Sequence, residues 1–124
     1  MYSPIVSDHF HSPRRVGPLV GATHRGTAGV PGEGPYVILW LKVESEHIVA
    51  AAYQSHGCPA AMASASMAAQ LIEGKSVDAA ARVTSEQIVS ELGGLPEGKE
   101  HCPRLAALAI GAALETRLHL VLEA

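Results

Sequence analysis

Two short segments around the two cysteines hold the residue types whose spacing could do chemistry. They are residues 56–59 (HGCP) and residues 101–103 (HCP). In both segments a histidine stands one or two positions before the cysteine, and a proline follows the cysteine directly. Proline is favoured at the first position of a helix, so both thiols are predicted to lie at or next to a helix N-cap.

A cysteine in that position is predisposed to ionise. The unpaired N–H groups and the dipole at a helix N-terminus favour a thiolate, which lowers the pKa of the thiol from about 8.5. Two such thiols with neighbouring imidazoles suit the coordination of a soft metal, and they also suit thiol exchange or sulfur transfer. The plainer alternative for either cysteine is a small buried apolar side chain. The separation of Cys58 from Cys102 is not that of a zinc finger, so the local pattern leaves these alternatives open.

The elements that must position these segments follow from the hydrophobic pattern. Glycine and proline crowd residues 13–36, which predicts turns and short extended pieces there. The apolar run YVILWLKV predicts a buried strand that pairs with the next β-rich run as a hairpin. The predicted strands cover residues 36–43 and 48–55, and the predicted helices cover residues 4–11, 59–73, 85–92 and 103–122. Ser3 and Thr84 are the expected N-caps of the first and third of these helices. Strands followed by helices indicate an α+β fold.

Length and charge limit the classes of function. With 124 residues, 48% of them apolar and 17% charged, the chain has enough material for one packed domain. A formal charge of −3 argues against nucleic acid as a partner. We find no apolar run long enough for a membrane span and no signal-peptide core near the N-terminus. We therefore expect a cytoplasmic protein that binds neither nucleic acid nor membrane and whose cysteines are thiols or ligands.

Four stretches of the sequence together resemble one protein family. Residues 2–14 (YSPIVSDHFHSPR) are similar to the family opening Y-x-P…DHY…NPRN, and residues 55–66 (SHGCPAAMASAS) are similar to its YGCGSAIASSS. Residues 73–76 (EGKS) correspond to its WVKGKT turn, and residues 91–102 (ELGGLPEGKEHC) to its ELGGLP-x-x-K-x-HC. In this order the motifs resemble the NifU/IscU family of iron–sulfur cluster assembly scaffolds, over essentially the whole chain.

The resemblance carries expectations for both the fold and the site. It implies a single domain over residues 1–124 with an α+β fold, in which a small three-stranded antiparallel sheet has helices packed on one face. It also implies that Cys58, Cys102 and His101 meet at one end of the molecule. There they would hold a [2Fe–2S] cluster or iron, with zinc as the alternative.

The sequence departs from the family pattern at the first metal ligand. The family motif A-C-G-D corresponds to residues 32–35, so that Glu33 replaces the cysteine and Pro35 replaces the aspartate. The remaining candidate ligands are Glu33, Cys58, His101 and Cys102. Their mixed sulfur, nitrogen and oxygen donors suit tetrahedral zinc, whereas a cluster would be held less firmly. The alternative for Glu33 is a solvated carboxylate on an exposed loop.

The resemblance also implies partners. In the family the last cysteine, here Cys102, accepts sulfur from a cysteine desulfurase, and Lys99 is close enough in sequence to add positive charge. Iron–sulfur acceptor proteins would receive the cluster. The chaperone motif L-P-P-V-K reads LPEGK at residues 95–99, and the loss of its apolar centre argues against a dedicated chaperone contact. We expect a monomer or a weak homo-oligomer.

Three functions remain after these observations. The leading interpretation is a metal-binding scaffold for iron–sulfur cluster assembly, which is not an enzyme. The first alternative is a zinc-binding structural or regulatory member of the family that builds no cluster. The second is a thiol-redox protein that uses Cys58 and Cys102 as a pair, although no Cys-x-x-Cys motif supports it.

Overall fold

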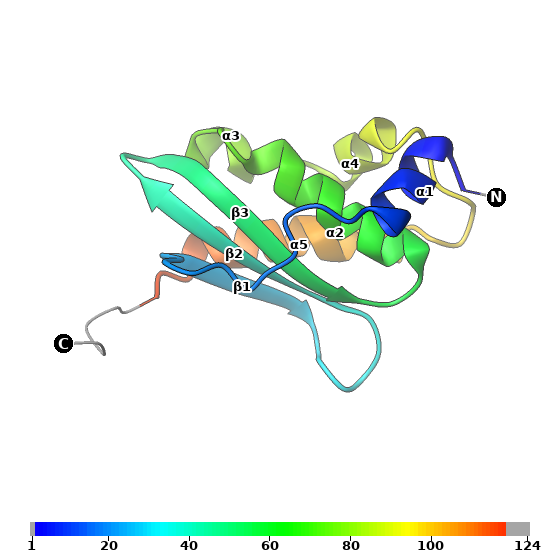
Figure 1. The fold of residues 1–124 in the computed structure, drawn as a ribbon, viewed down its shortest axis with the longest axis horizontal. Helices are drawn as coiled ribbons and strands as arrows, with labels where there is room; N and C mark the ends of the chain where they lie inside the picture. The colour runs from blue at the N-terminus through cyan, green and yellow to red at the C-terminus, as the bar shows by residue number, and fades with distance from the viewer. Residues whose placement is uncertain (1, 119–124) are drawn as a thin grey trace.

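The computed structural model describes residues 2–118 as five helices and three strands (Figure 1). In chain order they are α1 (Pro4–His11), β1 (His24–Gly29), β2 (Tyr36–Glu44), β3 (His47–His56), α2 (Pro59–Ile72), α3 (Val77–Ala81), α4 (Ser85–Glu91) and α5 (His101–Glu115). The predicted first helix, the hairpin and the two helices that follow it are confirmed within one or two residues at each end.

The three strands form an antiparallel sheet in the order β1-β2-β3. Along β2, Val37, Leu39 and Leu41 alternate with less buried neighbours, so one face of the sheet is apolar. Helices α2 and α5 cover that face, and α1 packs on α2 while α4 packs on α5 (Figure 1). The expected α+β class, with helices on one side of a small antiparallel sheet, is confirmed.

Three helices begin where polar side chains satisfy free backbone amides, and Ser76 provides this cap for α3. The Ser3 hydroxyl accepts a hydrogen bond from the Val6 amide at 3.1 Å, and the Thr84 hydroxyl accepts one from the Gln87 amide at 3.1 Å. The Ser3 hydroxyl also donates to the carbonyl of Leu92. This second bond ties the start of the chain to the end of α4.

Helix α5 lies unusually close to β1. A Cβ atom added at Gly26 would lie 2.6 Å from the Cα of Ala113, which is closer than real Cβ atoms come to other heavy atoms. Only glycine therefore allows the strand and the helix backbone to approach this closely.

The outer edge of β3 is hydrogen-bonded to two segments that are distant in sequence. The Ile48 carbonyl accepts a hydrogen bond from the Gly74 amide at 2.7 Å, and the Ile48 amide donates one to the Lys75 carbonyl at 2.8 Å. The Ala51 amide donates to the Glu73 carboxylate at 3.1 Å. Tyr53 exchanges two hydrogen bonds of 2.8 and 2.9 Å with residues 15–17. At Ile48, Ala51 and Tyr53 the backbone of β3 thus has hydrogen-bond partners on its outer side as well.

Three features differ from the sequence prediction. Helix α5 starts at His101 rather than residue 103, and it ends at Glu115, after which Arg117 pairs with His24. The predicted continuation over residues 116–118 is therefore wrong, and residues 119–122 lie outside the described part of the chain. Neither α3 nor the exact position of β1 was predicted, because five and six residues are too few for a clear hydrophobic period. Among the described helices, none combines the length and the apolar run that a membrane crossing requires.

Candidate functional site

Cys58 is the N-cap residue of α2, as its position before a proline predicts. It follows Gly57, whose φ of +147° lies in the region that favours glycine. A Cβ atom at this glycine would also lie 2.8 Å from the Cβ of Ala61. The sharp turn from β3 into α2 therefore depends on Gly57, and it leaves the Cys58 side chain partly exposed at the start of the helix.

Cys102 lies inside the first turn of α5, where it is only 1% exposed. The prediction that it lies at or next to the N-cap is wrong, because Glu100 takes the N-cap position and Cys102 is the second residue of the helix. A proline is tolerated at any of the first helical positions, whose N–H groups have no partner within the helix, so Pro103 does not have to mark the first residue. The Cys102 side chain packs against Ala60 and Ala61 of α2, so the starts of the two helices meet.

The two cysteines share one apolar cluster, into which Tyr2 and Leu95 also pack. His101 Nε2 lies 3.5 Å from the Cys102 Sγ. Lys99 and Tyr2 lie so close to Cys58 that the Cys58 thiol raises the pKa of both side chains. The structure thus brings together Cys58, Cys102 and His101, and it adds Tyr2 and Lys99 beside them.

The pKa values of the two thiols are shifted in opposite directions. Burial acts to raise the pKa of Cys58. Hydrogen bonds from the backbone amides of residues 60 and 61 and from the Cys102 thiol, and the charge of Lys99, act to lower it. Their sum exceeds the effect of burial, so the pKa of Cys58 is lowered. For Cys102, burial and the neighbouring Cys58 raise the pKa to about 12. The expectation of two thiolate-prone cysteines is correct for Cys58 and wrong for Cys102, because the helix dipole does not compensate for burial.

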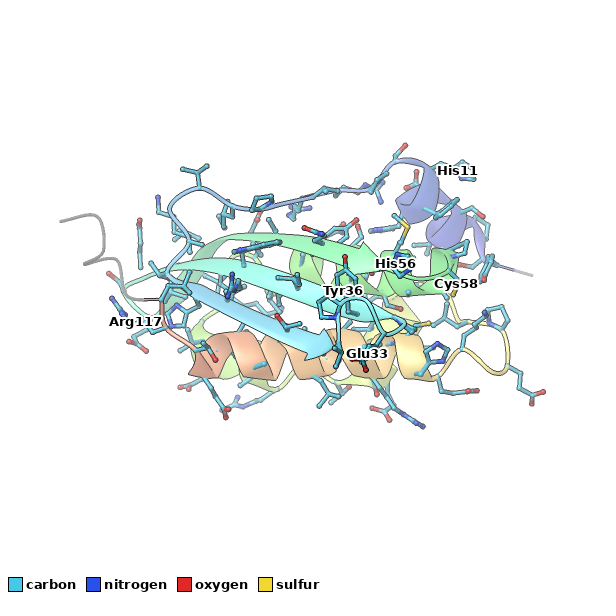
Figure 2. The ribbon with its side chains drawn as sticks, turned by 90° about the horizontal axis from the view of Figure 1, so that it is seen from below. His11, Glu33, Tyr36, His56, Cys58 and Arg117 are labelled. Carbon is cyan, nitrogen blue, oxygen red and sulfur yellow. The ribbon has the colours of Figure 1, made fainter. Side chains whose placement is uncertain are left out.

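Glu33 lies on the exposed loop between β1 and β2, at the same end of the sheet as Cys58 (Figure 2). Its amide donates to the Val30 carbonyl at 2.9 Å. Pro35 of this loop comes within 3.7 Å of the position that a Cβ on Gly57 would occupy, so the loop lies against the Cys58 turn. Within residues 2–118, however, the structure forms no group of three or more His, Cys, Asp or Glu side chains arranged to hold a metal ion.

His56 is exposed, and its ring stacks on Tyr36 with ring centres 5.8 Å apart (Figure 2). The two residues are partners across β2 and β3. Val37 faces the helices, so the preceding Tyr36 lies on the other face of the sheet, and His56 lies there with it. His56 is therefore the strand-end side chain that its position predicts.

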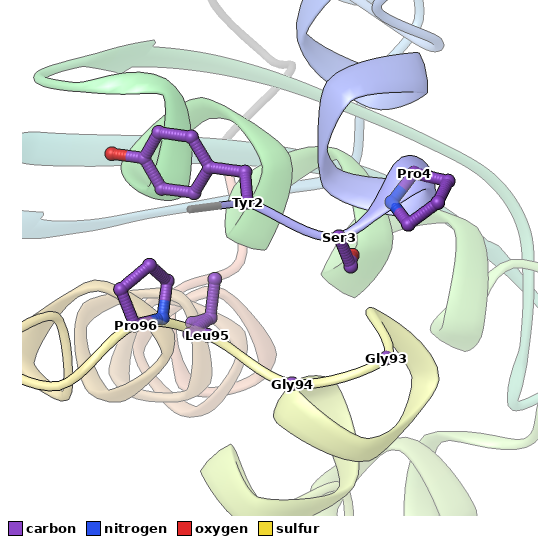
Figure 3. Close-up of a pocket in the computed structure, with 7 residues that line it drawn as sticks. All are labelled: Tyr2, Ser3, Pro4, Gly93, Gly94, Leu95 and Pro96. Carbon is purple, nitrogen blue, oxygen red and sulfur yellow. The ribbon is translucent and has the colours of Figure 1, made fainter.

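A groove of about 550 Å³ lies between the start of the chain and the loop that follows α4 (Figure 3). The N-terminal residues 2–4 form one wall, and residues 93–96 form the other. Tyr2 and Leu95 belong both to this groove and to the cluster around Cys102. In the sequence Tyr2 stands out only as part of a motif, and no local signal places it beside Cys58, which is distant along the chain.

The sulfur and nitrogen atoms of Cys58, Cys102 and His101 supply some, but not all, of the ligands that an iron–sulfur cluster requires. Such clusters prefer four thiolates and accept histidine in place of cysteine. The chain offers two sulfur atoms and one imidazole there. Soft sulfur donors favour a cluster or zinc over hard cations such as magnesium.

Comparison with known proteins gives the family of the chain. The sequence profile of the "NifU-like N terminal domain" matches residues 1–119. The chain belongs to this family. The resemblance identified from the sequence motifs is confirmed, and the match extends over almost the whole chain.

Individual relatives agree with this assignment. "Iron-sulfur cluster assembly scaffold protein IscU 1" of Archaeoglobus fulgidus is 40% identical over 114 residues, which are 92% of this chain and 74% of that protein. "Iron-sulfur cluster assembly enzyme IscU" of Drosophila melanogaster is 40% identical over 121 residues, covering 92% of this chain and 76% of that one. A crystal structure from Fervidobacterium islandicum, described as a putative iron–sulfur cluster assembly scaffold for the SUF system, superposes with a TM-score of 0.72 at 20% identity, covering 92% and 96% of the two chains. This last likeness concerns the fold alone.

Proposed function

We propose that this NifU-like chain is a scaffold on which an iron–sulfur cluster is assembled and from which it is passed on. The observation that carries the proposal is the meeting of two helix starts that brings Cys58 and Cys102 into one cluster beside His101. The names of the relatives support the same function and give no support to the zinc alternative.

Each residue has a role in this proposal. Cys58 and Cys102 bind iron of the incoming cluster as thiolates, and His101 is the third ligand. Because burial favours the protonated form of Cys102, iron binding must displace its proton, so cluster uptake releases protons. The positive charge of Lys99 lies beside Cys58 and offsets the negative charge of the thiolates.

We propose Glu33 as the fourth ligand, through its carboxylate oxygen. The loop that carries it lies against the Cys58 turn, and within the described residues its carboxylate takes part in no ion pair. Glycines at positions 32 and 34, both with positive φ, give this loop conformations that other residues rarely adopt. A movement of the loop would bring the carboxylate to the thiols.

The proposal includes a setting and partners. A cysteine desulfurase supplies the sulfur, and acceptor proteins remove the finished cluster. A reducing cytoplasm keeps both thiols free. The cluster is cargo, so the chain acts as a carrier rather than as an enzyme, and as a monomer or a weak homo-oligomer.

Anaerobic reconstitution tests the function directly. The metal-free protein is incubated with ferrous iron and sulfide, and visible absorbance, Mössbauer spectra and metal content are measured. We expect a [2Fe–2S] chromophore that is lost in Cys58→Ser and in Cys102→Ser and weakened in His101→Ala. His47→Ala, at the opposite end of the sheet, is the matched control. A wild-type protein that retains zinc and takes up no cluster would overturn the proposal.

A further inference from the structure

We propose that the outer edge of β1 binds an extended segment of a partner protein, which adds a further strand to the sheet. The segment runs antiparallel to β1, and its side chains alternate between acidic and apolar. This interaction surface goes beyond the proposed scaffold function and does not depend on it, because β1 supplies none of the proposed ligands.

The backbone of β1 has free hydrogen-bonding groups on the side away from β2. In an antiparallel pair, alternate residues turn their N–H and C=O groups toward the same neighbouring strand. The Arg25 amide points away from β2, because it donates to the Thr116 carbonyl at 3.2 Å. By this alternation Thr27 and Gly29 also face the outer edge. In the part of the chain that the structure describes, no backbone hydrogen bond reaches the Arg25 carbonyl, either group of Thr27 or the Gly29 amide.

The chain itself shows that this edge accepts an antiparallel strand. Arg117 forms an antiparallel bridge with His24, and the Leu118 amide donates to the Thr23 carbonyl at 2.7 Å. This short partner covers only the beginning of β1. In Figure 2, β1 lies beside α5, and no helix or strand passes in front of it. The edge over residues 27–29 is therefore accessible to a segment from outside the molecule.

A second copy of the chain does not fit this edge. Helix α5 lies directly against β1, since a Cβ atom at Gly26 would lie 2.6 Å from the Ala113 Cα. Pairing two β1 strands would place them about 4.8 Å apart and would carry the two α5 helices along with them. Packed helices need axes about 8–10 Å apart, so the two helices would collide. The edge instead suits an extended segment with no helix against it.

The face of α5 next to this edge is apolar. Leu105, Leu108 and Ala112 follow one another at spacings of three and four, so they share one face of the helix. The carbonyl carbon of Ala112 lies 2.6 Å from the position of a Cβ atom on Gly26, which places this face beside β1. Leu108 is 64% exposed. A strand added to β1 turns every second side chain toward the helix side of the sheet, and apolar residues are favoured there.

The opposite face of β1 carries a positive charge. Arg25 and Thr27 are exposed on it, whereas Gly26 and Ala28 are buried on the helix side. Arg25 belongs to none of the ion pairs formed by the described residues. The residues of an antiparallel segment that bond to Arg25 and Thr27 present their side chains on this same face. An acidic side chain opposite Arg25 gains a favourable cross-strand pair.

The test uses the full-length protein and end-capped synthetic peptides in which valine and glutamate alternate. The glutamates are the residues that bond to β1, so N-methylation of the glutamates removes the required N–H groups, whereas N-methylation of the valines spares them. Nitrogen–proton NMR titration measures binding. We expect the valine-methylated peptide to shift the amide signals of residues 25–29. The glutamate-methylated peptide should bind about tenfold more weakly, because hydrogen bonds are lost.

Equal binding of the two methylated peptides would overturn the proposal, and so would unchanged signals of residues 25–29 with the unmethylated peptide. This comparison needs no protein variant, so a folding defect cannot obscure it.

A charge reversal tests the preference for acidic segments. Arg25→Glu should weaken binding of the valine–glutamate peptide about fivefold and strengthen binding of a valine–lysine peptide, because the cross-strand charge changes sign. Arg82→Glu, exposed at the end of α3, is the matched control and should bind both peptides as the wild type does. The same order of affinities in Arg25→Glu and the wild type would overturn the assignment to an acidic partner.

Sedimentation velocity distinguishes the partner segment from a second copy. We expect the valine–glutamate peptide to leave the oligomeric state of the protein unchanged. A dimer that dissociates when this peptide is added would assign the edge to a second copy and overturn the proposal.

Discussion

Nearly identical local sequences produce two chemically different thiols in this protein. Both cysteines precede a proline near a helix start, yet Cys58 lies at the surface and Cys102 lies inside. The sequence motif predicts the start of α2 at Pro59 and the start of α5 to within two residues, because proline and glycine act locally. It does not predict the burial of Cys102, which depends on Tyr2 and the start of α2 packing against it from distant parts of the chain. That Cys58, Cys102 and His101 lie near one another was therefore predictable, and the burial of Cys102 was not.

The alkylation rates of the two thiols should respond differently to pH. In metal-free Cys102→Ser, the reaction of Cys58 with iodoacetamide should reach half its maximum rate at a lower pH than an unperturbed thiol does, because the backbone amides and Lys99 lower the pKa of Cys58. In Cys58→Ser, Cys102 should react slowly, and its rate should still rise above pH 10, since burial remains the largest cause of its raised pKa of about 12. Stopped-time mass spectrometry measures both rates. Coincident pH profiles would contradict this prediction.

Replacing Glu33 tests whether a carboxylate in place of the third cysteine weakens the binding of the cluster. Glu33→Cys adds a third sulfur donor, so a reconstituted cluster should survive a chelator several-fold longer than in the wild type. Glu33→Ala should shorten its lifetime. Glu44→Cys, at the opposite end of β2, controls for the effect of an added thiol. Decay of visible absorbance gives the lifetimes, and equal values in all four proteins would mean that the carboxylate is not a ligand.

Helices and strands with a clear hydrophobic period or a clear capping residue were predictable from the sequence. Short elements, and element ends that are set by tertiary contacts, were not. The hairpin and helix α2 follow from their apolar runs, and α4 follows from the Thr84 cap. The end of α5 does not, because the apolar pattern continues beyond Glu115 while the chain turns to pair with His24. Tertiary pairing outweighed helix propensity there.

Two glycine variants should have opposite effects on stability. Gly26→Ala places a methyl group 2.6 Å from Ala113 Cα of α5, so the helix must move away, and we expect a loss of about 3 kcal/mol or more, beyond ordinary overpacking. Gly111→Ala lies within α5, where a Cβ meets nothing within 4 Å, and should gain about 0.5–1 kcal/mol. Thermal unfolding followed by circular dichroism measures both. A Gly26→Ala protein with the wild-type Tm would show that the two backbones are not in close contact.

Considered as a whole, the molecule depends on a buried histidine that joins its N-terminal helix to the core. His9 of α1 is 3% exposed, and its Nδ1 lies 2.8 Å from the Ser66 hydroxyl of α2. Burial, followed by the charge of Arg14, lowers the pKa of His9. The folded protein therefore favours the neutral imidazole.

Stability should fall in mildly acidic solution. The unfolded chain takes up a proton near pH ~6.5, whereas folded His9 does so only at lower pH. The free energy of unfolding should thus decrease as pH falls below about 6.5 and level off below the folded pKa. His24, whose pKa is also lowered by burial, contributes with the same sign.

His9→Asn separates the contribution of His9 from the rest. It should cost about 1–3 kcal/mol at pH 7.5, through a disturbed buried hydrogen bond. It should also reduce the loss of stability between pH 7 and pH 5. His11→Asn, on the exposed side of α1, is the control. Urea unfolding at several pH values gives the slopes, and equal slopes in wild type and His9→Asn would exclude His9 as the source.

The partnered edge of β3 has a consequence for the protein in concentrated solution. A strand edge with free amides and carbonyls is a template on which another chain can add a strand, which leads to aggregation. Here residues 15–17 and 73–75 already occupy that template. The segment that leads from α1 into the sheet thus protects part of the β3 edge from the addition of another strand, while the residues just before α1 place Tyr2 beside the thiols.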